Sequence, residues 1–424
     1  MMKIAFYTLG CKVNQYDTEA MRELFEHAGW ETVPFEEKAD VYLINTCSVT
    51  QISDKKSRQM ISQAHRRAPE AFLVVTGCYA QTDPEKVKDL PGVGLVIGTD
   101  GRKEIVRTVD QAIAGSRTSG VSDIRRVRQF EEMGAVEESR TRAVLKIQDG
   151  CSNFCSYCVI PYARGPIRSR KPESVQAELK KLASNGFKEV VLTGIHLASY
   201  GLDLKDRKIR LTDILKIAEE TDGIERVRLG SLEPLFCDEV FAETASGLKK
   251  LCRQFHLSLQ SGSDTVLKRM NRRYDTAGFE KAVAGLRKHM PDCAVTTDVI
   301  AGFVGETEEE HLETCAFVRR IGFARMHVFP YSRRKGTAAD SMEGHLDRSV
   351  KERRASELIA IGKEMEETFV ESLIGTEQTV LIEDDGTGYT GNYVRVRCSG
   401  PEGELVRVRI TGRDHTIANG EVIS

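Results

Sequence analysis

The sequence predicts an α/β protein with three parts: an open parallel α/β sheet, a partial or complete (βα) barrel, and a β-rich tail. In residues 1–114, short apolar runs alternate with helical patterns, which is typical of a parallel sheet. The same alternation recurs from residue 142 onward in repeated βα units of the length that barrels use. Residues 369–424 contain runs that alternate apolar with charged side chains, as half-buried strands do.

The composition is that of a folded globular chain. Its 424 residues suffice for two or three domains, and 40% hydrophobic with 29% charged residues excludes a disordered chain. The net charge is −2, from 61 Lys and Arg against 63 Asp and Glu, so contact with nucleic acid depends on local patches. We expect a cytoplasmic protein without membrane contact, because signal-peptide and membrane-span patterns are missing. In that reducing compartment, the 11 cysteines indicate metal ligation, catalysis or burial rather than disulfides.

Cysteines follow three of the strands expected in the first region. The runs 3–8, 41–45 and 72–76 are typical of strands, and Cys11, Cys47 and Cys78 come shortly after their ends. Loops that leave the carboxyl ends of parallel strands lie along one edge of a sheet, where ligands bind. We therefore expect the three thiols to converge on a shared ligand. The alternative is that small, easily buried side chains lie near strand ends by chance.

Changes in sequence pattern divide the chain into a sheet domain (1–114), a polar linker (115–141), a barrel domain (142–368) and a tail (369–424). Barrel strands are expected at 143–147, 189–193, 226–229, 254–259, 294–300 and 325–328, and a charged helix at about 347–369. In the tail, the runs 394–396 and 406–410 flank the turn SGPEGE and predict a hairpin. One face of that hairpin would carry Arg395, Arg397, Arg407 and Arg409.

The strongest chemical signal is the segment IQDGCSNFCSYCVIPYARG, which directly follows an expected strand. Its cysteines, Cys151, Cys155 and Cys158, have the spacing CxxxCxxC. Three thiolates on one loop suit a cubic four-iron cluster and leave one iron open to another ligand. A structural zinc ion would need a fourth ligand, and the loop offers no further Cys or His. We interpret the loop as a catalytic iron–sulfur site, with a zinc site completed by a distant residue as the alternative.

This CxxxCxxC loop resembles the signature CxxxCxΦC of radical S-adenosylmethionine (SAM) enzymes, with Tyr157 as the aromatic Φ. The segments TLGCKVNQYDTEA, INTCSVT and VTGCYAQ also resemble the amino-terminal domain of methylthiotransferases, and the resemblance covers nearly the whole chain. It implies that SAM binds the open iron and that an electron from the cluster cleaves it to a 5′-deoxyadenosyl radical. It also implies a C-terminal TRAM domain, a small RNA-binding β-barrel, and a second 4Fe-4S cluster held by Cys11, Cys47 and Cys78.

Further contacts are expected for SAM and for RNA. Strand ends of the barrel that resemble SAM-binding segments contain Gly194, Glu233, Gln260 and Gly302. A glycine lets the backbone approach a ligand and a carboxylate can bond ribose hydroxyls, although either can simply build a turn. Basic residues after the cluster loop, Arg164 and Arg168 among them, are expected to bind RNA phosphates, with a solvated face as the alternative. In the TRAM domain, the four arginines of the hairpin are the expected RNA contacts.

The resemblance implies a tRNA methylthiotransferase that converts an adenine C2 hydrogen into a methylthio group, using two SAM molecules. TLGCKVNQYDTE, IQDGCSNFCSYC and TGIHLASYG are most similar to the MtaB-type branch, which acts on N6-threonylcarbamoyladenosine at position 37 of tRNA. The implied partners are the tRNA anticodon stem-loop and a flavodoxin- or ferredoxin-type electron donor, while the sulfur donor is not indicated. The alternatives are N6-isopentenyladenosine of tRNA, a ribosomal-protein aspartate, or a non-catalytic RNA-binding protein with structural metal.

Overall fold

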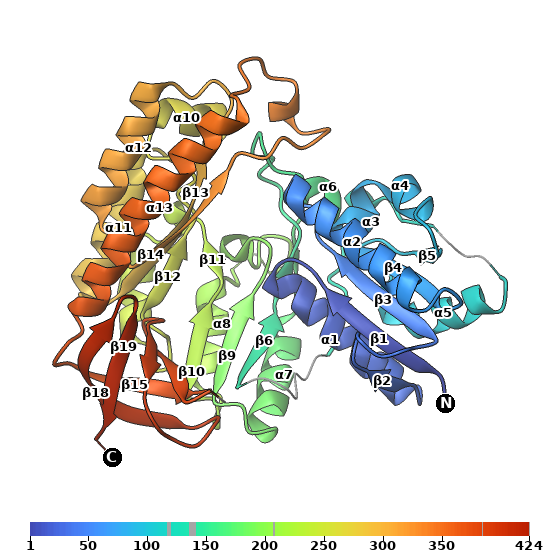
Figure 1. Cartoon of the computed structure of the whole chain (residues 1–424). Coiled ribbons are helices and arrows are strands. Elements are labelled where there is room, and N and C mark those ends of the chain that lie inside the picture. Colours follow the sequence, from blue (N-terminus) through green and yellow to red (C-terminus); the bar gives the residue numbers. More distant parts are fainter. Residues whose placement is uncertain (117–119, 135–140, 207, 384, 424) are drawn as a thin grey trace.

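The first part of the chain forms a five-stranded parallel sheet in the order β2-β1-β3-β4-β5. The computed structural model describes residues 1–116, 120–134, 141–206, 208–383 and 385–423, so 117–119 and 135–140 of the expected linker lie outside it. Strand β3 is buried along its whole length because helices pack on both faces of the sheet (Figure 1). The elements are β1 (Lys3–Thr8), α1 (Lys12–His27), β2 (Glu31–Val33), β3 (Val41–Thr46), α2 (Gln51–Arg67), β4 (Phe72–Gly77), α3 (Cys78–Thr82), α4 (Pro84–Lys88), β5 (Val93–Val96) and α5 (Ile105–Ile113).

The second part is a partial barrel of parallel strands. Its two sheets, β6-β9-β10 and β11-β12-β13-β14, are joined in sequence, because only Gly230 separates β10 from β11. The strands are β6 (Arg142–Lys146), β9 (Glu189–Thr193), β10 (Arg226–Leu229), β11 (Ser231–Leu232), β12 (Gln254–Leu257), β13 (Ala294–Ala301) and β14 (Arg325–Pro330). The covering helices are α7 (Pro172–Ser184), α8 (Leu211–Glu219), α9 (Glu239–Gly247), α10 (Asp264–Arg269), α11 (Thr276–His289), α12 (Glu308–Ile321) and α13 (Arg348–Glu371).

Shorter elements connect the barrel to the sheet domain. They are β7 (Gln148–Asp149), α6 (Ile160–Arg164), which packs against α3, and β8 (Arg168–Ser169). After β14, Arg334 donates to Asp54 of α2 at 2.6 Å, so the sheet domain contacts both edges of the partial barrel. No helix in the described ranges combines the length and the apolar character needed to cross a bilayer.

The third part is a closed barrel that follows helix α13. The helix itself extends past the expected domain boundary at residue 369. Its strands are β15 (Glu377–Ile382), β16 (Thr387–Thr390), β17 (Arg395–Arg397), β18 (Leu405–Asp414) and β19 (Ile417–Val422), in the order β15-β16-β17-β19-β18. The predicted hairpin of 394–396 with 406–410 is therefore wrong, because β19 lies between these two strands. Val396 and Val408 point into the barrel and the arginines point outward. The expected alternation of apolar and charged side chains is therefore present, and only the pairing of the strands differs from the prediction. The α/β fold class is confirmed.

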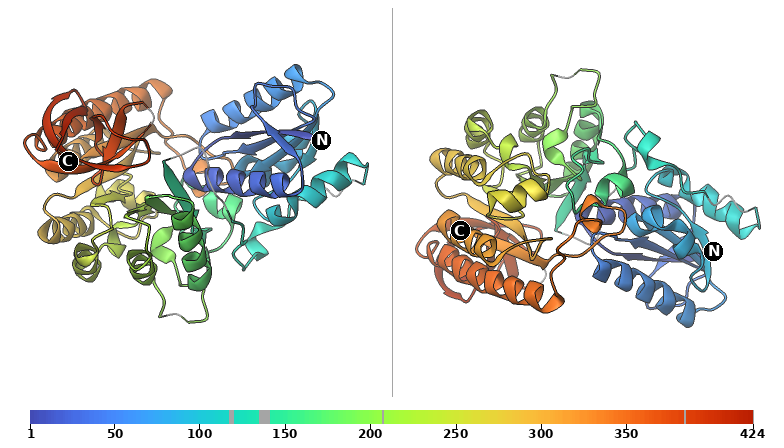
Figure 2. Two further views of the ribbon diagram at one scale, coloured as in Figure 1. Left: turned by 90° about the horizontal axis from the view of Figure 1, so that it is seen from below. Right: turned by 90° about the horizontal axis from the view of Figure 1, so that it is seen from above.

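Arginines at the starts of the barrel strands bind the C-terminal barrel. Arg226 and Arg228 of β10 donate to the carbonyls of Tyr389 and Gly391, at 3.1 Å in each case. The guanidinium of Arg142, the first residue of β6, lies 4.9 Å from the ring centroid of Tyr389, a cation–π contact. In both views of Figure 2, the C-terminal barrel and the sheet domain lie on opposite sides of the molecule. The C-terminal barrel thus contacts the amino-terminal ends of the strands, away from the loops that carry cysteines.

A buried group of charges joins the sheet domain to the partial barrel. The Asp17 carboxylate of α1 pairs with Arg102 and with Lys146 of β6 at 2.5 Å each, and with Arg164 of α6 at 2.8 Å. Asp149 pairs with the same lysine and the same Arg164, at 3.3 Å in each case. All of these side chains are at most 4% exposed. Because an unpaired buried charge is very costly, this group fixes the two domains against each other.

Replacing Asp17 with asparagine is expected to lower the free energy of unfolding at neutral pH by about 3–5 kcal/mol, because three buried cations lose a shared carboxylate. Burial alone raises the pKa of Asp17, but Arg102, Lys146 and Arg164 outweigh burial and hold that pKa far below its ordinary value. The ionised carboxylate therefore contributes stability above about pH 4, and this contribution is lost as the pH falls further.

Chemical denaturation between about pH 7 and pH 3, followed by circular dichroism, tests this expectation. The wild-type chain should lose stability below about pH 4, and the D17N chain should lose less. Asp83 is a matched control, because it lies 3.9 Å from Lys86 at the surface, where an ion pair contributes about 0–1 kcal/mol. A D17N chain as stable as a D83N chain would contradict the prediction.

Candidate functional site

The three amino-terminal cysteines meet at one edge of the first sheet. Cys11, Cys47 and Cys78 follow the carboxyl ends of β1, β3 and β4, which are neighbouring parallel strands. Gly10, with a φ of +106°, brings the first loop against the second: a Cβ at this position would lie 2.9 Å from the Cβ of Cys47. Only glycine fits this close approach. The structure thus brings together the thiols that the strand-end argument expects to converge.

The thiols of this amino-terminal site influence one another's ionisation. The pKa of Cys78 is raised to about 12, mainly by burial and in part by Cys47 and Cys11, against the lowering effect of Arg164. Burial also raises the pKa of Cys47. Such thiols ionise only beside additional positive charge, which a bound metal centre supplies.

The CxxxCxxC loop forms a second site between β7 and α6. Its backbone turns sharply at Phe154, which has a φ of 49°, an uncommon value for a residue with a side chain. The Phe154 carbonyl accepts a hydrogen bond from Nδ2 of Asn271 at 3.1 Å, and Oγ of Ser156 donates to the carbonyl of Arg269 at 2.7 Å. The loop is therefore fixed by the end of α10, on the partial barrel.

Arg272 faces the CxxxCxxC loop from the barrel side. Its Nη1 donates to Sγ of Cys155 at 3.2 Å, and its Nε donates to Oη of Tyr274 at 3.0 Å. Burial raises the pKa of Cys151 to about 11 and that of Cys158 to about 12. The guanidinium therefore gives this site a fixed positive charge beside thiols that are otherwise hard to ionise.

The two cysteine sites are joined where α3 packs on α6. Arg164, the last residue of α6, donates from Nε to Sγ of Cys78 at 3.4 Å.

The expectation that Arg164 and Arg168 bind RNA phosphates is wrong, because these side chains are 0% and 3% exposed, respectively. Asp17 and Asp149 already pair with these guanidinium groups. The basic run in the sequence gave no sign of these carboxylates, which come from α1 and β7.

Three of the expected SAM contacts lie at carboxyl ends of barrel strands, on the same edge as the CxxxCxxC loop. Gly194 follows β9, Gln260 follows β12 and Gly302 follows β13. Each of the two glycines lets a neighbouring side chain of the protein approach the backbone closely. An added Cβ at Gly194 would lie 2.9 Å from Cβ of Gln148, and one at Gly302 would lie 2.4 Å from Cγ of Lys351. The side chain of Gln260 makes no hydrogen bond to any other described residue, which leaves it available to a ligand.

Glu233, the fourth expected contact, is the centre of a polar group beside the CxxxCxxC loop. Its Oε2 accepts from Nδ2 of Asn153 at 3.1 Å and lies 2.7 Å from Nε2 of His196. Its Oε1 lies 3.8 Å from Nη2 of Arg272. Burial raises the pKa of Glu233, but the hydrogen bond with His196 and the charge of Arg272 outweigh it and hold the pKa below its ordinary value. The ionised carboxylate can therefore accept hydrogen bonds from hydroxyl groups.

Three members of this polar group were not predicted: Asn153, His196 and Arg272. Position gave a signal for the first two, since one lies inside the CxxxCxxC loop and the other just after the β9 strand end. Arg272 gave none, because it comes from a distant part of the chain. Tyr157, which was predicted, packs edge-on against Phe303, with 6.4 Å between ring centroids.

The arginines expected to bind RNA in the C-terminal barrel lie at its surface on two strands that are not neighbours. Strand β17 carries two of them and β18 the other two, with β19 between. Each arginine pairs with an acidic side chain at the surface, and their role in RNA binding stays a prediction. The pairs are Arg395–Asp385, Arg397–Asp414, Arg407–Glu377 and Arg409–Glu377.

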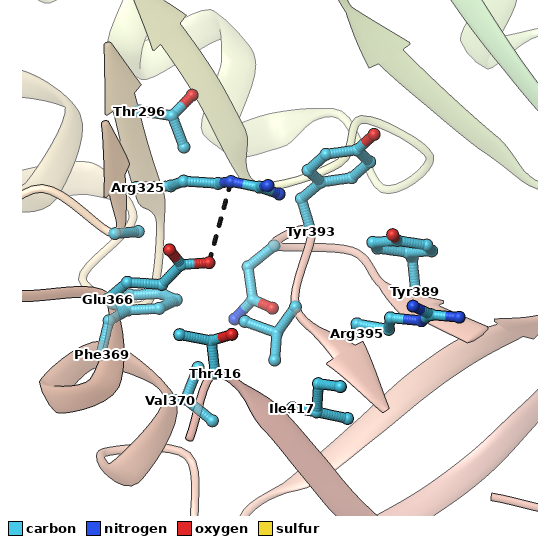
Figure 3. A pocket seen from close by; sticks show the side chains of 13 residues that line it. Thr296, Arg325, Glu366, Phe369, Val370, Tyr389, Tyr393, Arg395, Thr416 and Ile417 are labelled. Carbon is cyan, nitrogen blue, oxygen red and sulfur yellow. Dashed lines mark ion pairs between the residues drawn. The ribbon is translucent and has the colours of Figure 1, made fainter. Parts of the chain in front are cut away.

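A pocket of about 210 Å³ lies between the partial barrel and the C-terminal barrel (Figure 3). Arg325 and Glu366, an ion pair at 3.8 Å, line one side, and Tyr389, Tyr393 and Arg395 line the other. Arg325 begins β14, so the pocket lies at the amino-terminal ends of the barrel strands. It is therefore separate from both cysteine sites.

The charges around the amino-terminal site fit an anionic group bound there. Within the part of the chain that the structure describes, four buried cations pair with three carboxylates: Arg102, Lys146, Arg164 and Arg168 with Asp17, Asp149 and Glu131. The group thus has one positive charge in excess, and its Arg164 contacts Cys78, so an iron–sulfur centre with thiolate ligands would balance the charge. No three His, Cys, Asp or Glu side chains of the described ranges close around a single ion. A four-iron cube spreads its ligands around a larger centre.

Comparison with known proteins covers the whole chain. Residues 3–98 match the family described as "Uncharacterized protein family UPF0004" and residues 145–318 match the "Radical SAM superfamily". The chain is 42% identical to threonylcarbamoyladenosine tRNA methylthiotransferase MtaB of Bacillus subtilis, over 100% of this chain and 97% of that protein. It is 40% identical to MtaB of Aquifex aeolicus, over 96% and 100% of the two chains. Identity to a tRNA-2-methylthio-N(6)-dimethylallyladenosine synthase of Moorella thermoacetica is 33%, over 98% and 97%.

Solved structures share the fold at low identity. The radical SAM methyltransferase TsrM of Kitasatospora setae, with cobalamin and a [4Fe-4S] cluster bound, has a TM-score of 0.58 and 16% identity, covering 77% of this chain and 75% of that one. The cobalamin-dependent SAM radical enzyme OxsB has a TM-score of 0.53 and 11% identity, covering 87% and 56%. At these identities the likeness establishes the fold alone.

Proposed function

Because the chain belongs to the family of radical SAM tRNA methylthiotransferases, we propose that it replaces the C2 hydrogen of N6-threonylcarbamoyladenosine, at position 37 of tRNA, with a methylthio group. The observation that carries this proposal is the pair of three-cysteine sites, which are joined through the packing of α3 on α6 and the bond from Arg164 to Cys78. Relatives named for threonylcarbamoyladenosine are 37–42% identical to this chain, and those named dimethylallyladenosine synthases are 31–34% identical. This difference supports the threonylcarbamoyl branch.

Membership in the radical SAM family implies a 4Fe-4S cluster and SAM, and the residues present fit them. The CxxxCxxC loop would hold this cluster, and the amino-terminal site would hold a second one. When bound, the first cluster would supply the electron that cleaves one SAM molecule, and the second would supply the centre for sulfur transfer. A second SAM molecule would supply the methyl group, so one turnover would consume two SAM molecules. The relatives are named as a methylthiotransferase and a synthase, both of them enzymes, which disfavours a non-catalytic RNA-binding protein.

The side chains around these sites bind and orient. Adenine C2–H has no acidity that a side-chain base can use, so the protein's task is positioning. Glu233, kept ionised by His196 and Arg272, would accept hydrogen bonds from the ribose hydroxyls of SAM. The bond from Arg164 to Cys78 joins α6, which follows the CxxxCxxC loop, to the amino-terminal site, and so helps to fix the two sites relative to each other. The partners are the tRNA anticodon stem-loop and a flavodoxin- or ferredoxin-type reductant, in the cytoplasm.

Mass spectrometry of nucleosides tests the proposal. Reconstituted protein, SAM and a reductant are incubated anaerobically with tRNA that carries either N6-threonylcarbamoyladenosine or N6-isopentenyladenosine. We expect a methylthio product on the first tRNA alone. A product on the second alone would overturn the substrate assignment. SAM cleavage without a product on either tRNA would contradict the proposal and favour a ribosomal-protein aspartate.

Replacing Glu233 with glutamine is expected to weaken SAM binding roughly 10- to 100-fold, because a hydrogen bond to a charged group contributes about 1.5–3 kcal/mol. Equilibrium dialysis of SAM against reconstituted protein measures the effect. The control is Glu239→Gln, a change of an exposed carboxylate that pairs with Lys288 at the surface. Equal dissociation constants for the two variants would show that Glu233 does not contact SAM.

Replacing Arg397 and Arg409 together with glutamine is expected to weaken tRNA binding and to reduce its salt dependence. Each lost phosphate contact lowers the slope of log K against log salt by about one unit. Fluorescence anisotropy with labelled tRNA over a salt series gives both quantities. Arg348, 89% exposed on α13, provides the control substitution to glutamine. If both proteins show the same slope, the C-terminal barrel does not bind tRNA through these two arginines.

A further inference from the structure

Arg164 connects the partial barrel to the amino-terminal cysteine site through every nitrogen of its guanidinium group. Nε donates to Sγ of Cys78 at 3.4 Å. Nη1 donates to Oδ2 of Asp17 at 2.8 Å and to Oδ2 of Asp149 at 3.3 Å, and Nη2 donates to Oδ1 of Asn14. The side chain is completely buried. Its donors are thus used within the protein, and one of them is directed at a cysteine sulfur.

The amide of Asn14 extends this contact to the other two cysteine loops. Its Nδ2 donates to the carbonyl of Leu9 at 2.7 Å and to the carbonyl of Thr46 at 3.0 Å. Leu9 lies two residues before Cys11, and Thr46 directly precedes Cys47. The guanidinium group of Arg164 therefore bonds one cysteine sulfur directly. Through the Asn14 amide it is also linked to the backbone just before each of the other two cysteines.

We propose that Arg164 is a positioning residue of the amino-terminal cluster: it sets the spacing of the three cysteines and donates an N–H···S hydrogen bond to the Cys78 sulfur. This inference rests on the proposed function, which places a 4Fe-4S cluster there. Hydrogen bonds to the sulfurs help to set the reduction potential of an iron–sulfur cluster. They stabilise the reduced, more negative state, so Arg164 makes this cluster easier to reduce.

A neighbouring arginine separates this role from that of an ordinary buried ion pair. Arg102 is as buried as Arg164 and pairs with the same Oδ2 of Asp17, but it has no contact with a cysteine sulfur in the described structure. It also pairs with Glu131 at 3.1 Å. Replacing either arginine disturbs the same group of charges, and only the Arg164 change removes the bond to sulfur.

The test uses the full-length chain with Cys151, Cys155 and Cys158 replaced by alanine, so that only the amino-terminal site can hold iron. In this parent chain, Arg164→Lys is compared with Arg102→Lys by iron and sulfide content and by redox titration followed by electron paramagnetic resonance. We expect Arg164→Lys to lower the iron content and to shift the midpoint potential to a more negative value, and Arg102→Lys to leave the potential unchanged. Equal potentials and iron contents in the two variants would overturn the proposal.

A second measurement needs no arginine variant, so it tests the bond from Arg164 to the Cys78 sulfur even if the Arg164→Lys chain does not fold. The parent chain is labelled with ¹⁵N in its arginine guanidinium groups, and the reduced cluster is examined for a ¹⁵N hyperfine coupling. A coupling supports the N–H···S bond, and its absence contradicts it. A parent chain that binds no iron would overturn the proposed second cluster itself, an outcome distinct from a cluster that is insensitive to Arg164.

Discussion

Replacing Cys155 with alanine is expected to reduce SAM cleavage to the background level. The CxxxCxxC loop offers three thiols, and a four-iron cube with one open iron uses all of them. The Cys155 sulfur is also the atom to which Arg272 donates at 3.2 Å, so the change removes a ligand and leaves Arg272 without this sulfur acceptor. Chromatographic detection of 5′-deoxyadenosine, formed anaerobically with a strong reductant, measures the loss.

The control for this change is Cys315→Ala, because Cys315 is a half-buried thiol on α12 with no contact to either cysteine site. This variant should cleave SAM at the wild-type rate. Wild-type cleavage by the Cys155→Ala chain would contradict the assignment of the CxxxCxxC loop as the SAM-cleaving site.

Replacing Cys47 with alanine is expected to abolish the methylthio product while 5′-deoxyadenosine still forms. Cys47 belongs to the sheet domain, whereas the CxxxCxxC loop is fixed to the end of α10 by the bond from Ser156 to Arg269. Loss of the Cys47 thiol therefore leaves the SAM-cleaving site intact and removes one of three ligands from the other site. Nucleoside mass spectrometry and 5′-deoxyadenosine assays on the same reaction separate the two effects.

The matched control is Cys398→Ala, because Cys398 is a buried thiol in the core of the C-terminal barrel. It should retain both activities. If Cys47→Ala abolished SAM cleavage as completely as Cys155→Ala, the two cysteine sites would not have separate roles. If it still formed the methylthio product, the amino-terminal site would not take part in the reaction.

Much of the sheet and barrel could be predicted because their strands are short, buried apolar runs. The predicted strands 3–8, 189–193 and 226–229 agree with β1, β9 and β10 residue for residue. The helix expected at about 347–369 is α13, Arg348–Glu371. The meeting of the three amino-terminal cysteines also followed from local pattern, because it needs only that parallel strands end along one edge.

What could not be predicted depends on contacts between distant parts of the chain. Alternation shows that Val396 and Val408 face inward, but closure of the barrel decides that β19 separates their strands. The basic run after the CxxxCxxC loop suggested a surface, whereas Arg164 and Arg168 are buried and pair with Asp17 and Asp149 in the interior. The polar group around Glu233 could likewise be predicted only in part, because its members come from distant parts of the chain.

The central claim is that the chain holds two separate iron–sulfur clusters, one at each three-cysteine site. Mössbauer spectroscopy of ⁵⁷Fe-reconstituted protein, combined with iron and sulfide analysis, tests it on three chains. These are the wild type, a chain with the three CxxxCxxC cysteines replaced by alanine, and a chain with the three amino-terminal cysteines replaced. We expect each triple variant to retain about half of the wild-type iron, with the spectrum of a 4Fe-4S cluster. A triple variant that keeps all of the iron, or loses all of it, would contradict the claim.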